Sequence, residues 1–168
     1  LRRRESRIVA LLAANLANPT MAAIAASAEE SLRRAGYVMV LCDMHDRADL
    51  QDEYLLEMRA QWVKSIVLLG AVASPQLEAF VEAGEQLLFV NRRCPGHPDA
   101  PFVGIDNRAA GAEVARFFLD HHIREAAVIH GPLSSSATAD RVAAFRGAMA
   151  RAGCRMSARH VATADGTD

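Results

Sequence analysis

Hydroxyl-bearing residues and an arginine follow one another closely between Gly131 and Arg141. Three serines, Ser134-Ser135-Ser136, follow Gly131-Pro132 at the end of an apolar run and open a stretch of helical periodicity. Hydroxyls and free amides at a helix N-terminus suit a polyhydroxylated or anionic ligand. Arg141 comes shortly afterwards, and a helical side chain leans back towards the start of its helix. Its guanidinium could therefore bind a carboxylate or two neighbouring hydroxyls at the same place.

Simpler interpretations of the same residues stay open. A single serine is enough to cap a helix, although three exceed what a cap needs, and an arginine on a helix is often only solvated. Asp106-Asn107, between an apolar run and a helical stretch, suits both helix capping and a hinge at a crossover between two lobes. The two roles are compatible at one position.

Patterns for enzymatic or metal chemistry are absent from the sequence. It contains no Gly-rich dinucleotide fingerprint, no Walker A loop and no G-x-S-x-G elbow. His121 and His122 are neighbours that point in different directions, and Cys94 with His97 makes one weak pair without a second half. The three cysteines are odd in number and widely spaced, which argues against a disulfide framework. We expect no metal, no cofactor and no enzymatic activity.

Strand-length apolar runs alternate with helical stretches in the first part of the chain. The predicted strands cover 7–13, 37–42, 65–69 and 86–90, and the predicted helices cover 20–35, 48–61 and 75–83. The near-continuous apolar strands predict a parallel sheet with helices on both faces. The fold class is therefore α/β with a doubly wound parallel sheet.

The pattern restarts after a proline-rich loop at 91–101. Predicted strands cover 102–105, 126–130 and a start at 159–163, and predicted helices cover 107–121 and 135–152. About two strands and two helices form too little sheet to close a core of their own. We therefore expect a complete first lobe and a partial second lobe.

Composition and charge narrow the function further. Hydrophobic residues make up 51% and charged residues 23% of the chain, as in ordinary globular proteins. Nineteen Lys and Arg against 20 Asp and Glu give a net charge of −1, so no global field attracts nucleic acid. The local basic cluster, Arg2-Arg3-Arg4 with Arg7, reads as a solvated tail. Without a membrane-length apolar run or a signal peptide pattern, we expect a cytoplasmic protein.

The order of several motifs resembles the LacI/GalR family of transcriptional regulators. Asp106-Asn107 is followed by Gly111, a strand ends in Gly131-Pro132, and a later helix begins its motif with Arg141. Asn18-Pro19 after the first strand, Gly36-Tyr37 before the second and Asn91-Arg92 after the fourth fit the same family pattern. Each motif is weak alone, but their order and spacing are specific.

The resemblance implies a periplasmic-binding-protein-like fold with a small-molecule effector, a sugar or sugar derivative, in the cleft between two lobes. It divides the chain into a linker remnant at 1–6 after a missing DNA-binding head, an N-terminal lobe at 7–103, and a crossover with a partial C-terminal lobe at 104–168. Operator DNA would be bound through the absent head, and a homodimer is implied. Effector contacts carried over from the family fall at Thr20, Met21, Asn91, Ser135, Ala137 and Arg141, and the hinge falls at Asp106 and Asn107.

The sequence departs from the family pattern at two places, and two other functions stay open. Thr20-Met21 replaces residues that are often aromatic, and His122-Ile123 replaces a Gly-His pair that would end a helix. A solute-binding protein of a transport system shares the fold but would need a signal peptide. A nucleotide-dependent enzyme would need the missing glycine fingerprint.

Overall fold

A computed structural model describes residues 6–154, 156 and 161–164. The chain divides into two compact units, Leu1–Val103 and Gly104–Asp168, each of which is described by itself. The linker remnant expected at 1–6 lies outside the described residues except for Ser6. Within the described part of the chain, no helix is long and apolar enough to cross a membrane.

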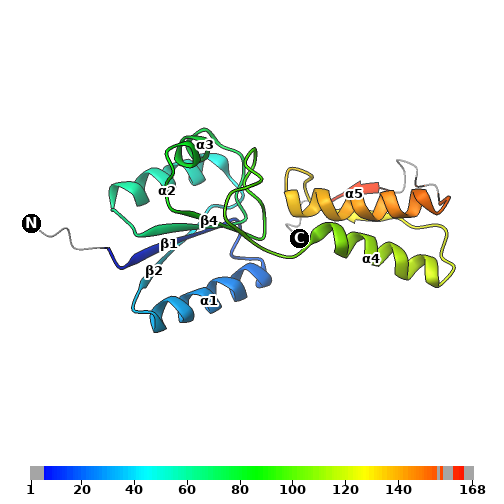
Figure 1. Cartoon of the computed structure of the whole chain (residues 1–168), viewed down its shortest axis with the longest axis horizontal. Helices are drawn as coiled ribbons and strands as arrows, with labels where there is room; N and C mark the ends of the chain where they lie inside the picture. Colours follow the sequence, from blue (N-terminus) through cyan, green and yellow to red (C-terminus); the bar gives the residue numbers. More distant parts are fainter. Residues whose placement is uncertain (1–5, 155, 157–160, 165–168) are drawn as a thin grey trace, which may run out of the picture. The chain divides into compact units, whose positions relative to one another are not determined.

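Unit 1 is built on a five-stranded parallel sheet in the order β2-β1-β3-β4-β5. Its strands are β1 (Ile8–Ala13), β2 (Val38–Asp43), β3 (Ser65–Leu69), β4 (Leu87–Val90) and β5 (Phe102–Val103). Its helices are α1 (Pro19–Arg34), α2 (Ala48–Ala60) and α3 (Pro75–Glu82). Helix α1 covers one face of the sheet and α2 and α3 cover the other (Figure 1). The predicted α/β architecture with helices on both faces is confirmed.

The two faces of β1 belong to two separate cores. Ala10 and Leu12 pack with residues of α2 and α3 such as Leu55 and Phe80. Leu11 and Ala13 point to the opposite face, where α1 covers them. Side chains of a strand alternate between faces, so an uninterrupted apolar run is required when both faces are covered. The sequence of β1 is therefore explained by its central position.

Helix ends follow local signals in most places. Asn18 accepts hydrogen bonds from the amides of Thr20 and Met21, and Pro19 begins α1. After α1 the chain turns at Gly36 with a φ of 81°, a left-handed conformation that glycine adopts readily. Trp62 after α2 and His122 after α4 hold the same conformation with φ of 55° and 58°. The missing glycine before Ile123 is thus replaced by a left-handed histidine.

Unit 2 contains two long helices and, among its described residues, two strands. Helices α4 (Asn107–Asp120) and α5 (Ser136–Arg151) lie side by side (Figure 1). Strands β6 (Val128–His130) and β7 (Val161–Thr163) form a parallel pair. Phe145 and Met149 of α5 are buried together with Ala115 of α4, and this cluster is the core of the unit.

Two strands are shorter than predicted. β5 spans Phe102–Val103 instead of 102–105, and β6 spans Val128–His130 instead of 126–130. β5 is an edge strand that pairs only with β4, and β6 pairs with β7 from Val128 onwards. Apolar residues outside a pairing register do not extend a strand. Residues 159–160 of the predicted last strand lie outside the described residues.

Candidate functional site

Polar side chains collect at the carboxyl-terminal edge of the sheet in unit 1. All strands of this sheet are parallel, so the segments that follow them leave at one edge. Asn15 follows β1, Asp43 ends β2, Gly70 follows β3, and Asn91 and Arg92 follow β4. In open α/β sheets, ligands bind at this edge. The edge is therefore the candidate ligand-binding part of unit 1.

Asp43 holds two of these segments together. Its Oδ2 accepts a hydrogen bond from the backbone amide of Leu16 at 3.1 Å, across 27 residues of sequence. Its Oδ1 accepts one from the amide of His45 at 3.2 Å. With both oxygens engaged, Asp43 fixes the start of the loop after β1 against the end of β2.

Arg92 makes the corresponding connection among the other strands. Its side chain is 14% exposed, and its guanidinium forms an ion pair with Asp46 of the segment after β2. The same nitrogen donates a hydrogen bond to the carbonyl oxygen of Gly70 at 3.3 Å. A partly buried guanidinium with a carboxylate partner is well ordered. Arg92 therefore links the ends of β2, β3 and β4.

Left-handed backbone is concentrated at the same edge. His45, Asp46 and Asn91 have φ of 51°, 55° and 68°. Asn, Asp and His adopt this conformation more often than other non-glycine residues, yet it still carries strain. Such residues cluster at binding sites, where surrounding contacts hold them.

The predicted contacts of unit 1 differ in their accessibility. Thr20 is exposed in the first turn of α1, where its amide donates to Asn18 Oδ1 at 2.9 Å. Asn91 is half-buried at the end of β4. Met21 is 6% exposed and packs with Leu11 in the core below α1. The structure thus places Thr20 and Asn91 at the strand-end edge and gives the Met21 side chain a packing role.

In unit 2 the segment 131–135, here called the serine loop, leads into α5. Ser135 occupies the N-cap position of this helix, but its side chain does not cap it. Ser135 precedes α5 with φ −75° and ψ 115°, the same backbone angles as Asn18 before α1. The Asn18 side chain caps its helix, whereas the Ser135 side chain makes no capping hydrogen bond. Ser135 and Ala137 are 6% and 4% exposed. The presence of a serine at position 135 is therefore not explained by capping.

Arg141 borders a cavity inside unit 2. The cavity has a volume of about 440 Å³, and its polar wall includes His130, Thr138 and Arg141. Apolar side chains of α4 and α5, such as Val114 and Phe145, form much of the remainder. An apolar hollow with a few polar groups on its wall is the usual form of a small-molecule site. Arg141 itself is exposed on α5.

The Asp106-Asn107 pair begins α4. Asp106 Oδ1 accepts a hydrogen bond from the amide of Ala109 at 2.9 Å, so its capping role is confirmed. Asn107 is 7% exposed, and its Nδ2 donates to the carbonyl of Ile105 at 3.4 Å. Its Oδ1 is buried without a hydrogen-bond partner among the described residues. The hinge role stays a prediction.

The structure also describes the residues weighed as metal ligands. His97 pairs through Nε2 with Glu78 at 2.8 Å, and Cys94 is buried. Burial, and to a lesser degree the charge of Glu78, raises the pKa of the Cys94 thiol to about 11. No group of three or more His, Cys, Asp and Glu among the described residues is placed to hold a metal ion.

Sequence reasoning missed three residues with clear roles at or near these sites. Asp43 and Arg92 connect strand ends at the candidate edge, and Gly111 packs directly against the backbone of Arg141. Arg92 lies in the Asn91-Arg92 motif, which was a signal for it. Gly111 lies in the Asp106-Asn107 motif. Asp43 had no signal beyond its place at the end of an apolar run.

Solved structures with the same fold define the class of protein. The transcription regulator CcpA of Lactococcus lactis superposes with a TM-score of 0.82 at 18% identity, covering 94% of this chain and 58% of that one. A transcriptional regulator CelR–cellobiose complex gives 0.79 at 24% identity, covering 99% and 53%. The chain has a periplasmic-binding-protein-like α/β fold.

Sequence comparison shows the family. The family described as periplasmic binding proteins and sugar binding domain of LacI family matches residues 6–168, and the chain belongs to it. The ribose operon repressor of Bacillus subtilis is 27% identical over 149 residues, which are 89% of this chain and 43% of that protein. The transcriptional repressor PurR of Proteus mirabilis is 25% identical over 88% of this chain and 44% of its own length. The chain thus spans less than half the length of these relatives, whose names describe repressors.

Proposed function

We propose that this chain is the ligand-sensing domain of a cytoplasmic transcriptional repressor. It binds a sugar or a similar small polar effector and controls operator binding allosterically, as a homodimer. Operator contact is made by a DNA-binding head of the full-length protein outside this chain. The observation that carries the proposal is the arrangement at the start of α5, where Arg141 borders a cavity and the side chain of Ser135 makes no capping hydrogen bond.

The names of relatives support a carbohydrate effector. One is a ribose operon repressor, one solved regulator is a complex with cellobiose, and another is complexed with D-xylulofuranose. Sugars offer several hydroxyls, which match the donor fork of Arg141 and the hydroxyls of Ser135 and Thr138. We propose that Thr20, Asn91, Ser135, Ala137 and Arg141 form effector contacts, and that Met21 supports them through its packing below the edge.

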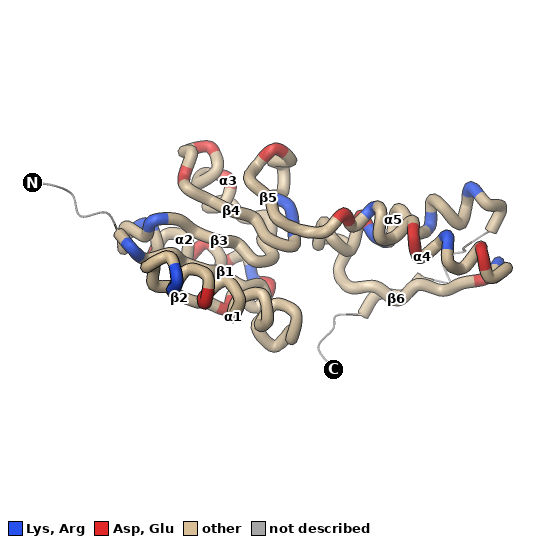
Figure 2. The backbone as a smooth tube through the Cα atoms, turned by 60° about the horizontal axis from the view of Figure 1, so that its bottom comes forward, with Lys and Arg blue, Asp and Glu red and all other residues tan. Residues whose placement is uncertain are grey.

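The charge distribution supports a DNA contact made elsewhere. Acidic and basic residues both occur along the helices of each unit (Figure 2). A specific DNA-binding surface normally collects basic residues on one face. This distribution supports the proposal that the described part of the chain senses a ligand while DNA is read elsewhere.

A gel-shift experiment on the full-length protein tests this proposal. We expect it to bind its own promoter DNA at physiological salt, and one of D-ribose, cellobiose or D-xylulose to change the fraction bound. The 168-residue chain alone should show no sequence-selective binding. Sugar binding without any DNA binding by the full-length protein would favour the transport alternative, and DNA binding that ignores every sugar would contradict effector control by sugars.

A further inference from the structure

Helices α4 and α5 touch through their backbones at Gly111. A Cβ atom at position 111 would lie 2.3 Å from the carbonyl oxygen of Arg141 and 3.0 Å from its carbonyl carbon. The 2.3 Å distance is shorter than any real Cβ contact, and the atoms concerned are backbone atoms that cannot rotate away. Any other residue at position 111 would therefore push α5 away from α4 at the turn that carries Arg141.

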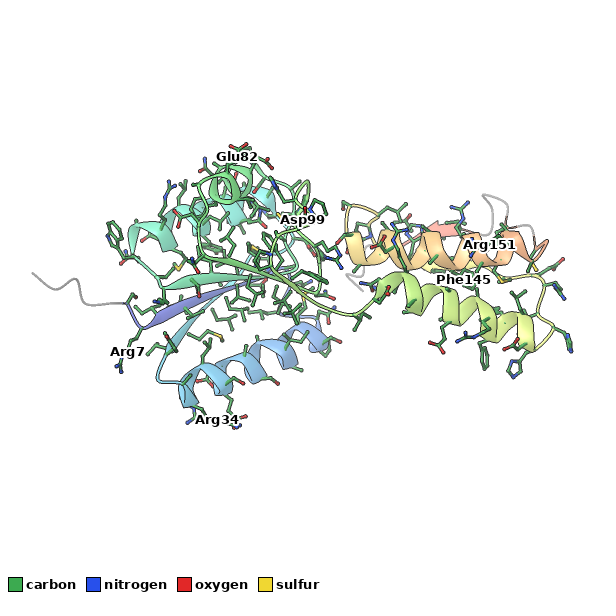
Figure 3. The ribbon with its side chains drawn as sticks, viewed as in Figure 1. Arg7, Arg34, Glu82, Asp99, Phe145 and Arg151 are labelled. Atoms are coloured by element: carbon green, nitrogen blue, oxygen red, sulfur yellow. The ribbon has the colours of Figure 1, made fainter. Side chains whose placement is uncertain are left out.

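The two helices also run in the same direction along each other. Arg108 near the start of α4 pairs with Asp140 near the start of α5 at 2.8 Å. Further along, the rings of Phe118 and Phe145 meet edge to face with centroids 5.7 Å apart, and Figure 3 shows Phe145 between the two helices. Contacts that advance together along both helices indicate a parallel pair. The helix starts at Asp106 and Ser135 therefore lie at the same end of the pair.

This arrangement connects the Asp106 junction with the start of α5. Asp106 caps α4 immediately after the segment that leaves unit 1, and Ser135 begins the helix that carries Arg141. A backbone contact transmits displacement more directly than contacts between flexible side chains do, because neither partner can adjust its rotamer. When α4 shifts, the turn of α5 around Arg141 must therefore shift with it.

We propose that Gly111 is a positioning residue for Arg141, and that the contact it allows couples the Asp106 junction to the serine loop. The proposal rests on the proposed function, in which Arg141 binds the effector. Gly111 lies on the wall of the same cavity but has no side chain to offer an effector. Its role is to hold the Arg141 backbone at the distance from α4 that places the guanidinium on the cavity wall.

A double-mutant cycle in the full-length protein tests the positioning role. The sugar panel consists of D-ribose, cellobiose and D-xylulose. We expect Gly111→Ala to weaken binding of the sugar that wild type binds by about tenfold or more, with affinity measured by calorimetry. In an Arg141→Ala background the same change should weaken it less than about twofold, because the group that it positions is already gone. Gly147→Ala on α5 is the matched control, since its Cβ would lie 3.4 Å from the flexible end of Arg151. Equal effects of Gly111→Ala in both backgrounds, or no more effect than Gly147→Ala, would overturn the proposal.

Charge exchange provides a second variant set if Gly111→Ala does not fold. Asp140→Arg would repel Arg108 and loosen the helix pair at an accessible position, because the two side chains are 28% and 74% exposed. We expect this change to weaken sugar binding and Arg108→Asp in the same chain to restore it. Failure of the double variant to recover affinity would count against coupling through the helix pair.

A measurement without any sugar keeps the coupling testable whatever the effector is. Asp106→Ala removes the cap of α4, and we expect faster amide hydrogen exchange both there and at 138–141 in α5. Asn18→Ala removes the cap of α1 and should leave exchange at 138–141 unchanged. Unaltered exchange at 138–141 in Asp106→Ala would overturn the coupling. If no panel sugar binds wild type, the sugar assignment fails while this experiment still decides the coupling.

Discussion

The side-chain amide of Gln51 pairs with both backbone groups of Val72. Nε2 donates to the Val72 carbonyl at 2.8 Å, and Oε1 accepts from the Val72 amide at 3.0 Å. Nε2 also donates to the hydroxyl of Ser74 at 2.7 Å. Gln51 is fully buried on α2, so it fixes the segment between β3 and α3 from within the protein.

Replacing Gln51 by leucine should therefore be strongly destabilising. The change would leave the amide and carbonyl of the half-buried Val72 without partners, and a fully buried unsatisfied group costs about 1–3 kcal/mol. We expect a loss of about 2–4 kcal/mol in the free energy of unfolding, measured by urea denaturation. Gln61→Leu is the control, because the Gln61 amide bonds only Glu57 on the exposed side of the same helix. Losses of similar size in both variants would contradict this role of Gln51.

Arg141→Ala should weaken the effector response of the full-length protein. A lost hydrogen bond to a charged group costs about 1.5–3 kcal/mol, which is roughly tenfold or more in affinity. Operator affinity and folding should change little, because Arg141 is exposed. Calorimetry with the panel sugars measures the effect, and Arg146→Ala on the same helix is the control. Equal sugar affinities of wild type and Arg141→Ala would show that Arg141 is a surface arginine.

The Cys94 thiol should make stability fall in alkaline solution. Its pKa is raised from 9.0 to about 11 in the folded protein, mainly by burial. The folded state therefore holds this proton more tightly than the unfolded state does. The corresponding stability is fully present below pH 9 and is lost as the pH rises towards about 11.

Denaturation of wild type and Cys94→Ala across this range measures the difference. We expect the stability advantage of wild type to shrink between pH 8.5 and 11 and to stay constant below it. In addition, iodoacetamide at pH 8 should modify Cys94 much more slowly in the folded protein than in urea. A constant difference across the whole range would contradict the elevated pKa.

Self-association should involve the open edge of the sheet in unit 1. Among the described residues β2 pairs with β1 alone, and its residues Val38 and Leu41 are 63% and 43% exposed. An exposed apolar edge strand favours pairing with a second copy through a two-fold axis. We expect light scattering to show a dimer of the full-length protein and Val38→Lys to shift it towards monomer. Leu56→Lys, at an exposed position of α2, is the control and should leave the dimer intact. A strictly monomeric wild type would contradict the prediction.

Only some of the alanines of α1 are accessible for self-association. Ala22, Ala23 and Ala26 are exposed and available to a partner, whereas Ala25 is 3% exposed and faces the core. A helix whose small residues continue beyond its buried face is compatible with close approach of a second surface. Substituting Ala26 with glutamate should therefore weaken association, as Val38→Lys does.

Local patterns explain why most elements were predictable from the sequence. Helix α5 was expected at 135–152 and spans Ser136–Arg151, because its apolar spacing and Gly153 mark its course and its end. β1 and β3 were equally clear, since buried central strands are continuously apolar. The short strands β5 and β6 were overestimated because pairing partners, and not residue types, set their ends.

The candidate site was less predictable for the same reason. Gln51 and Val72 are 21 residues apart, and Arg92 and Asp46 are 46 residues apart, so no local window contains either pair. The importance of Gly111 depends on the path of another helix. Ser135 and Arg141 were found because their signals, a strand end and a helix start, are local. The burial of Met21 was also indicated locally, because Met21, Ile24 and Ala28 recur at helical spacing on one apolar stripe, which packs against Leu11.

The left-handed residues at the edge of unit 1 have a consequence for laboratory evolution. His45 and Asp46 each hold a conformation that costs a residue with a Cβ roughly 1 kcal/mol, and that glycine adopts freely. A library selected only for heat resistance should therefore enrich glycine at position 45, where no partner of Arg92 is lost. At position 46 glycine would relieve the same backbone strain but remove the carboxylate that pairs with the partly buried Arg92. Two adjacent codons with the same backbone conformation should thus evolve differently under one selection.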